Sequence, residues 1–235
     1  MTKIAIIPAR GGSKRIPMKN IRGFFGVPAI ARTLKMLVDS EIFDHVLVST
    51  DSEEIAQVAQ TIEKVQVISR PPNLADDFTP TVPVISHAIE VYRNNLDRSS
   101  HNEPLEVCCV YPINPFLNIN DLSLGLTILQ EREGVSYVNS IVSYPYPIQR
   151  AVKLDPSGKM EMFNPSLALT RSQDLEEAYH DAGQWYWGNA ETWLAGEKLL
   201  FNSIGVQIPR WRAQDIDTIE DWEYAERLFR LQESI

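Results

Sequence analysis

The sequence predicts an α/β protein with a mostly parallel sheet, helices on both faces and a small antiparallel insertion. Three observations predict this fold class. Short apolar segments of strand length alternate with helical segments through about the first 130 residues, which is the rhythm of βαβ units. After about residue 136, short segments separated by proline, glycine and aspartate replace that rhythm and favour hairpins. The βα pattern then returns near the C-terminus.

The first half of the chain contains four expected strands and four expected helices. Residues 3–8 are almost continuously apolar, as in a strand buried on both faces of a parallel sheet. Pro28 is suited to open the first helix, and 50–54 begins the second with acidic residues in its first turn. The other expected strands are 45–49, 65–68 and 107–111, and the other expected helices are 81–91 and about 121–129.

In the second half of the chain the strand–helix alternation stops and then returns near the C-terminus. Residues 136–143 form an expected strand that a Tyr-Pro-Tyr-Pro run interrupts. Segments on either side of an Asp-Pro-Ser-Gly turn predict a hairpin, and an acidic helix and an aromatic strand follow. These later elements are expected at 151–154, 159–163, 171–190, 204–208 (strand) and about 218–231 (helix). We therefore expect a single domain over residues 1–235, with an insertion at about 140–190.

Composition excludes several classes of protein. The chain of 235 residues has 44% hydrophobic and 23% charged residues, as in ordinary globular proteins. Its net charge of −9 argues against nucleic-acid binding. Cys108 and Cys109 are adjacent in an apolar run, which indicates buried thiols in a reducing cytosol. Neither a signal peptide nor an apolar stretch of roughly 18 residues is present, so we expect a cytoplasmic protein with no membrane partner.

The clearest functional motif is a basic loop over residues 9–20. Residues 1–38 carry eight lysines or arginines and no acidic residue, so this end of an acidic chain can attract a polyanion. The loop follows the first expected strand, where open α/β sheets bind ligands, and its glycines let backbone amides approach an anion. The alternative is a solvated surface turn. The candidate phosphate-binding residues are Ala9, Arg10, Gly11, Gly12, Ser13, Lys14, Lys19 and Asn20.

A second motif is an aspartate pair near the C-terminus. Asp215 and Asp217 are two residues apart, and in an extended segment such residues point the same way. Both carboxylates can then face one Mg²⁺, which usually takes one or two protein carboxylates and fills its other positions with water and phosphate. The alternative is a helix start, because Thr218 and Asp221 have the spacing of a capping box. Together with the basic loop, the pair predicts a site for a metal-bound nucleotide.

An ordered set of motifs resembles the CMP-sialic acid synthetase family along essentially the whole chain. The motifs are Ile-Pro-Ala-Arg-Gly-Gly-Ser at 7–13 with Lys-Asn at 19–20, Ser-Thr-Asp at 49–51, Arg-Pro at 70–71 and Asp-Ile-Asp-Thr at 215–218. The resemblance implies a Rossmann-like core and a homodimer formed through the insertion. It also implies Mg²⁺-dependent transfer of CMP from CTP to the anomeric hydroxyl of a nine-carbon acidic sugar.

The resemblance also assigns roles. It implies that Arg10 and Lys19 hold the triphosphate, that Asp217 with Asp215 holds Mg²⁺, and that Asn20 faces the cytidine. Arg70 and Thr81 would also contact the cytidine, unless Arg70 is a solvated residue and Thr81 an N-cap. The candidates for sugar binding, within one chain or across a dimer interface, are Tyr111, Arg171, Gln173, Tyr179, His180 and Gln184. His180 serves either as a general base or as a hydrogen-bond donor.

Two segments narrow the expected sugar. Residues 144–151 and 171–184 are similar to the branch of the family that acts on pseudaminic acid. Tyr111 stands where sialic acid enzymes carry a glutamine, which favours a sugar with different polar substituents. The same chemistry on sialic, legionaminic or octulosonic acid is one alternative. The other is a non-catalytic nucleotide-binding module, which the presence of both motifs disfavours.

Overall fold

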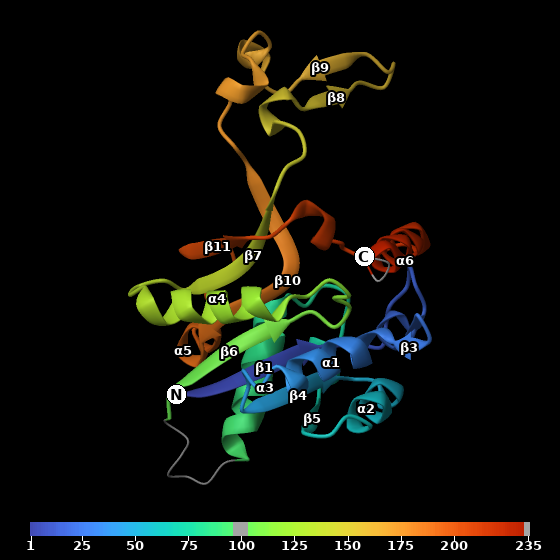
Figure 1. The fold of residues 1–235 in the computed structure, drawn as a ribbon, viewed down its shortest axis with the longest axis vertical. Helices are drawn as coiled ribbons and strands as arrows, with labels where there is room; N and C mark the ends of the chain where they lie inside the picture. The colour runs from blue at the N-terminus through green and yellow to red at the C-terminus, as the bar shows by residue number, and fades with distance from the viewer. Residues whose placement is uncertain (96–102, 233–235) are drawn as a thin grey trace.

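The computed structural model describes residues 1–95 and 103–232 and has a seven-stranded sheet at its centre (Figure 1). The strand order is β11-β7-β10-β6-β1-β4-β5. Only β10 runs against its neighbours; β1 pairs parallel with β4 and β6, β4 with β5, and β7 with β11. The strands are β1 (Thr2–Pro8), β4 (His45–Thr50), β5 (Val65–Ser69), β6 (Leu105–Val110), β7 (Tyr137–Ser143), β10 (Tyr179–Asn189) and β11 (Ser203–Gln207).

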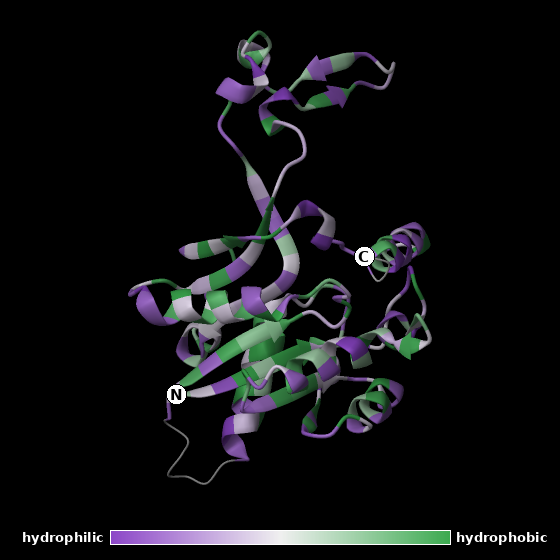
Figure 2. Cartoon of the chain, in the orientation of Figure 1, coloured by the Kyte–Doolittle hydropathy of each residue, from purple (hydrophilic) through white to green (hydrophobic). Residues whose placement is uncertain are grey.

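Helices cover both faces of this sheet, as predicted. One apolar cluster joins alternate residues of β1, such as Ile7, to α1, α2 and α4. A second cluster joins the intervening residues, such as Ile6, to α3 and α5 on the opposite face. Because successive strand residues point to opposite faces, the continuously apolar β1 supplies both clusters. The helices are α1 (Ala29–Asp39), α2 (Glu53–Gln60), α3 (Thr81–Asn94), α4 (Ile119–Glu131) and α5 (Ala190–Leu194). Figure 2 shows the apolar colouring concentrated on the central strands.

The aromatic strand β10 is locked into the core. Trp185 and Trp187 are fully buried, and the indole of Trp187 donates to the carbonyl of Leu122 at 3.0 Å. A Cβ on Gly125 would lie 2.6 Å from the ring of Trp185, so only glycine lets α4 approach the strand this closely. The tryptophans are therefore core residues, and they hold β10 beside β6.

A projecting arm, residues 144–178, lies within the segment expected as an insertion at about 140–190. Its flanking strands β7 and β10 belong to the central sheet, since β10 pairs with both β6 and β7. The predicted hairpin is present as β8 (Val152–Leu154) and β9 (Met160–Met162). The expected acidic helix is only a 3₁₀ turn at Ser172–Asp174. Figure 1 shows the arm extending away from the sheet beyond β7 and β10.

The C-terminal helix α6 (Ile219–Gln232) packs beside the basic loop. Its Trp222 and Ala225 share an apolar cluster with Ile16 of the loop and with Ile216. Phe24 of the short β2–β3 hairpin (Gly23–Phe24 and Val27–Pro28) stacks edge-on against Trp222, with ring centroids 5.6 Å apart. This cluster brings the basic loop that follows β1 together with the C-terminal helix. Among the described residues, no helix has the length and apolar character needed to cross a membrane.

Candidate active site

The candidate site lies where the strand order reverses, at the carboxyl ends of β1 and β6. From β1 the chain proceeds to β4 and β5 on one side, whereas β6 lies on the other side. Ligands of open α/β sheets bind at such a point because the loops on either side diverge and leave a crevice. The loop after β1 is the basic loop, and Tyr111 follows β6 directly.

Neighbouring polar groups fix the shape of the basic loop. The amide of Gly11 donates to Oδ1 of Asp51 at 2.9 Å, and a Cβ on Gly11 would lie 2.8 Å from Cβ of Ser52. Asn20 is buried and its side-chain amide donates to the carbonyl of Arg10 at 2.9 Å. The loop is thus shaped before any ligand binds, with Asn20 holding its base and also lining the cleft beside Lys19.

Lys19 joins the two motifs that the sequence singled out. Its Nζ donates to the carbonyl of Ile216 at 2.7 Å and to Oδ1 of Asp217 at 3.2 Å. Arg15 reaches the other oxygen of Asp217, with Nη2 at 2.6 Å from Oδ2. Residues almost 200 positions apart therefore form one charged cluster. Sequence reasoning counted Arg15 as a basic residue of the loop but did not place it in the site.

The aspartate segment contains the predicted helix start, which is formed by residues other than the aspartate pair. Thr218 and Asp221 form the capping box: Oδ2 of Asp221 accepts from the Thr218 amide at 2.7 Å, and Oγ1 of Thr218 accepts from the Asp221 amide at 3.2 Å. Asp217 is therefore not needed to cap α6. Ile216 is buried in the cluster under α6, while Asp215 and Asp217 on either side of it line adjoining parts of the cleft.

The charge on the aspartate pair fits a cation. Burial, and then repulsion from Asp217, raise the pKa of Asp215, against the lowering effect of Lys19. Within residues 1–95 and 103–232, no three His, Cys, Asp or Glu side chains gather as a metal centre. Two carboxylates suffice for Mg²⁺, which keeps waters and takes phosphate oxygens. The donors present fit that ion.

Arg70 follows β5 and Tyr111 follows β6, two strands that β1 and β4 separate in the sheet. Arg70 is buried rather than solvated, and its Nη2 donates to the carbonyl of Ser49 at 2.7 Å; burial lowers the pKa of Arg70. The hydroxyl of Tyr111 lies 2.9 Å from Oγ1 of Thr81, the first residue of α3, so Thr81 is not an N-cap. Burial raises the pKa of Tyr111 to about 12, so its hydroxyl stays protonated at neutral pH.

The cleft consists of two pockets that share Lys19, and neither Arg70 nor Thr81 is among the residues that line it. One part is lined by the carboxyl end of β6, the bulge of β10 and the aspartate segment, and the adjoining part is lined by the basic loop; Lys19 lines both. The first part is lined by Lys19, Asn20, Tyr111, Pro112, Ile113, Gly183, Gln214, Asp215 and Ile216. The second part is lined by Arg10, Ser13, Lys14, Arg15, Ile16, Lys19 and Asp217.

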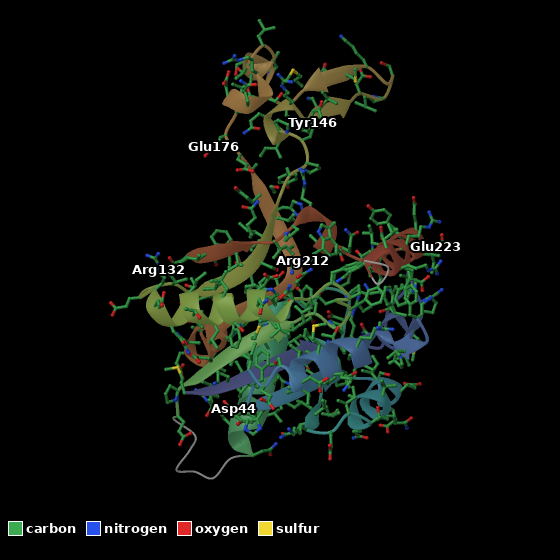
Figure 3. All side chains as sticks on the ribbon, viewed as in Figure 1. Asp44, Arg132, Tyr146, Glu176, Arg212 and Glu223 are labelled. Carbon is green, nitrogen blue, oxygen red and sulfur yellow. The ribbon has the colours of Figure 1, made fainter. Side chains whose placement is uncertain are left out.

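Only two of the six sugar-binding candidates lie at or beside this cleft. Tyr111 lines it, and Gln184 is its buried neighbour on β10, donating to the carbonyl of Arg212 at 2.6 Å. The other four are exposed on the arm or at its junction with β10: Arg171, Gln173, Tyr179 and His180. Figure 3 shows Glu176 and Tyr146, which flank this part of the arm, far from Arg212 beside the sheet. The structure does not bring these four residues to the cleft of the same chain.

The local partners of these four residues are within the arm and its base. Arg171 Nε lies 2.6 Å from Oδ2 of Asp174, and the hydroxyl of Tyr179 donates to Glu177 at 2.7 Å. The ring of His180 lies 4.7 Å from that of Tyr144, between centroids. Nδ1 of His180 lies 2.8 Å from the carbonyl oxygen of Asp181, and His180 is not among the residues that line the cleft.

Comparison with known proteins identifies the family of the chain. The family model described as cytidylyltransferase matches residues 4–232. A pseudaminic acid cytidylyltransferase of Campylobacter jejuni is 38% identical over 98% of this chain and 97% of its own length. A Helicobacter pylori protein that joins pseudaminic acid cytidylyltransferase to a hydrolase is 30% identical over 92% of this chain and 40% of its own.

A solved structure shares the fold. CMP:2-keto-3-deoxy-manno-octonic acid synthetase, solved in complex with CTP, superposes with a TM-score of 0.69, covering 99% of this chain and 100% of that one. Its sequence identity of 15% supports the fold alone. The likeness is to a mostly parallel, Rossmann-like sheet with helices on both faces, as the sequence predicts.

Proposed function

The chain belongs to the cytidylyltransferase family, and on that premise we propose that it transfers CMP from CTP to pseudaminic acid with release of pyrophosphate. The observation that carries the proposal is the meeting of Lys19 and Arg15 with Asp217 at the carboxyl ends of the parallel strands. Similarity to pseudaminic acid cytidylyltransferases over nearly the whole chain supports the sugar. An N-acylneuraminate cytidylyltransferase of Escherichia coli is less similar, at 27% identity.

The reaction replaces a phosphoanhydride bond of CTP with a phosphoester bond to the sugar. The anomeric oxygen of the sugar bonds to the α-phosphorus of CTP, the bond from that phosphorus to the bridging oxygen breaks, and pyrophosphate leaves with the electron pair. The hydroxyl proton is lost to solvent or to a base. Such transfers depend mainly on positioning and charge stabilisation. We assign the triphosphate to Arg10, Lys14, Lys19 and the amide of Gly12. The amides of Gly11 and Ser13 donate within the chain, to Asp51 and to the carbonyl of Gly11, and so shape the loop that Asn20 also holds.

We assign Mg²⁺ to Asp215 and Asp217. When bound there, the ion would neutralise charge on the phosphates. Lys19 reaches Asp217 and the carbonyl of Ile216, so it holds the aspartate segment against the basic loop. Asn20, Arg70 and Thr81 remain our candidates for the cytidine side, with Arg70 acting from its buried position behind Ser49.

The sugar is expected to enter between Tyr111 and the bulge of β10. Tyr111 is a protonated donor beside Thr81. Gly183 also lines the cleft; its left-handed φ of 63° favours glycine, so no side chain projects into the cleft at this position. The remaining candidates, Arg171, Gln173, Tyr179 and His180, fit this proposal only if the arm of one subunit reaches the cleft of its partner.

We therefore propose a homodimer formed through the arm. Its exposed apolar side chains include Tyr146, Phe163 and Leu169, which are 74%, 68% and 97% exposed in the single chain. Replacing Leu169 or Phe163 with glutamate is expected to yield a monomer, because a buried unpaired carboxylate opposes the interface. Sedimentation velocity measures the change. Leu124→Glu on α4, which is 50% exposed, is the matched control and should remain dimeric. A dimer that survives both arm substitutions would overturn the proposed interface.

A panel of acidic sugars tests the substrate. With CTP and Mg²⁺, the protein is expected to form the CMP adduct of pseudaminic acid at least roughly tenfold faster than the adducts of sialic, legionaminic or octulosonic acid, since a site built for particular polar groups rejects their replacement. Product mass and pyrophosphate release measure this. A preference for another acid would replace the sugar while keeping the chemistry. No product with any acid would favour a non-catalytic nucleotide-binding module.

We place the reaction in the cytoplasm. Cys108 and Cys109 are both free and fully buried, and burial raises the pKa of both thiols. Adjacent free thiols suit a reducing compartment.

A further inference from the structure

The carboxylate of Asp77 pairs with two cationic side chains of the basic loop. It forms ion pairs with both Arg10 and Lys14, and Nη1 of Arg10 also donates to the carbonyl of Asp76 at 3.2 Å. Asp77 belongs to the segment between β5 and α3, more than 60 residues after the loop that it contacts. Nothing in its sequence context marked it as part of the site.

The turn that presents Asp77 is built locally. Oδ1 of Asp76 accepts from the amides of Phe78 and Thr79 at 2.9 and 2.6 Å and from the Thr79 hydroxyl at 2.7 Å. Phe78, next to Asp77, is 91% exposed, so the turn buries little apolar surface. It can therefore move away from the loop without opening a core, while its own hydrogen bonds remain intact.

The ion pairs of Asp77 with Arg10 and Lys14 are also weak enough for phosphate oxygens to replace the Asp77 carboxylate. The side chains of Asp77, Arg10 and Lys14 are 31%, 36% and 80% exposed, and exposed ion pairs contribute little because water screens them. A triphosphate brings several charged oxygens to the same cations and forms stronger, charge-assisted hydrogen bonds with them. It cannot take full hold of Arg10 and Lys14 while the Asp77 carboxylate remains on both.

We propose that Asp77 is an internal counter-ion that competes with phosphate for Arg10 and Lys14. It thereby determines how tightly the basic loop binds CTP and how readily the loop releases pyrophosphate. Because the β- and γ-phosphates of CTP become pyrophosphate, the same competition acts on substrate and product. Asp77 acts through the two cations, so it is a positioning residue. The proposal rests on the proposed function, which assigns the triphosphate to this loop.

The test compares Asp77→Asn with the unaltered protein by calorimetric titration. The neutral amide keeps the size of the side chain and removes its charge. We expect pyrophosphate and CTP to bind about three- to tenfold more tightly, as the loss of up to two exposed pairs implies, and pyrophosphate to become a stronger product inhibitor. The KM for CTP should fall. Cytidine, which has no phosphate, should bind as before. Asp77→Glu, which keeps the charge, should restore the original pyrophosphate affinity.

Asp39→Asn on α1 is the matched control. Asp39 pairs with Lys35 on the helix surface, so this change alters the net charge equally without touching the loop. If Asp39→Asn tightens pyrophosphate binding as much as Asp77→Asn does, the effect is one of overall charge and the proposal is wrong. Unchanged or weaker pyrophosphate binding by Asp77→Asn also overturns it, as does a parallel loss of cytidine binding, which would show a structural role.

Binding of pyrophosphate separates this proposal from the proposed function. A protein that binds pyrophosphate more tightly after Asp77→Asn but makes no CMP-sugar from any acid would support the counter-ion and sink the transferase. If the protein makes CMP-pseudaminic acid but Asp77→Asn does not change pyrophosphate binding, the transferase is supported and the counter-ion role of Asp77 is overturned.

Discussion

A protein carrying Asp217→Asn is expected to lose cytidylyl transfer by on the order of 10²- to 10³-fold in kcat, the scale of removing one preorganised charge-stabilising group. The substitution keeps the shape of the side chain but weakens it as a cation ligand. It also leaves Arg15 and Lys19 without their shared carboxylate. Binding of Mg²⁺-free CTP should therefore persist, because both cations stay available to the phosphates. Continuous detection of pyrophosphate release measures turnover.

Asp221→Asn is the control for the fold of the same segment. Asp221 accepts from the amides of Asp217 and Thr218 at the start of α6, so its loss should cost about 1 kcal/mol of stability, as for other capping residues, with little change in kcat. Thermal unfolding separates the two effects. Undiminished turnover in Asp217→Asn, or an equal loss of activity in Asp221→Asn, would contradict the assignment of Asp217 to the metal.

Replacing Lys19 with methionine is expected to lower kcat/KM by about 10²-fold, with contributions from both CTP binding and turnover. The change removes a cation from the centre of the cleft and two hydrogen bonds to the aspartate segment. Charge-assisted contacts of this kind are worth more than neutral ones, and Lys19 is mostly buried, with its side chain 23% exposed. Steady-state kinetics at varied CTP give the two contributions.

Lys14→Met provides the comparison within the same loop. The Lys14 side chain is 80% exposed and pairs only with Asp77 among the contacts described, so water screens its charge and the loss should stay below about tenfold. If Lys19→Met and Lys14→Met behave alike, position in the cleft does not matter and the basic loop acts only through its overall charge. Unchanged kinetics in Lys19→Met would return the loop to an ordinary surface turn.

Most of the fold could be predicted from the pattern of apolar residues along the sequence. The strands β1, β4, β5 and β6 were predicted because short, mainly apolar segments of strand length alternate with helical segments in this part of the chain. The helices α1 and α3 followed from apolar stripes and α2 from acidic residues in its first turn; the structure adds that Ser52 caps α2 by accepting from the Ile55 amide at 3.3 Å. The helix α5 and the hairpin of β2 and β3 are too short to show a period, so sequence alone did not predict them.

The site was partly predictable for a similar reason. Lys19, Asp215 and Asp217 belong to motifs placed after strands, and the topology of an α/β sheet brings such places together. Asp77 lies in a turn between a strand and a helix, and its role depends on a contact with a loop far away in sequence. No comparable rule applies to the arm. Its composition indicated an antiparallel segment, but no sequence pattern predicts whether a projecting hairpin contacts its own chain or another subunit.

The arm begins and ends at one point of the sheet. Ser143, the last residue of β7, is the direct partner of Tyr179, the first residue of β10, so residues 144–178 leave and return side by side. The pairing register shifts between Asp181 and Tyr186, below that junction. Changes in the length of the arm therefore do not alter the spacing of the strands that frame the cleft. During divergence, such a segment can be lengthened, shortened or exchanged as a unit while the strands that frame the cleft are inherited intact.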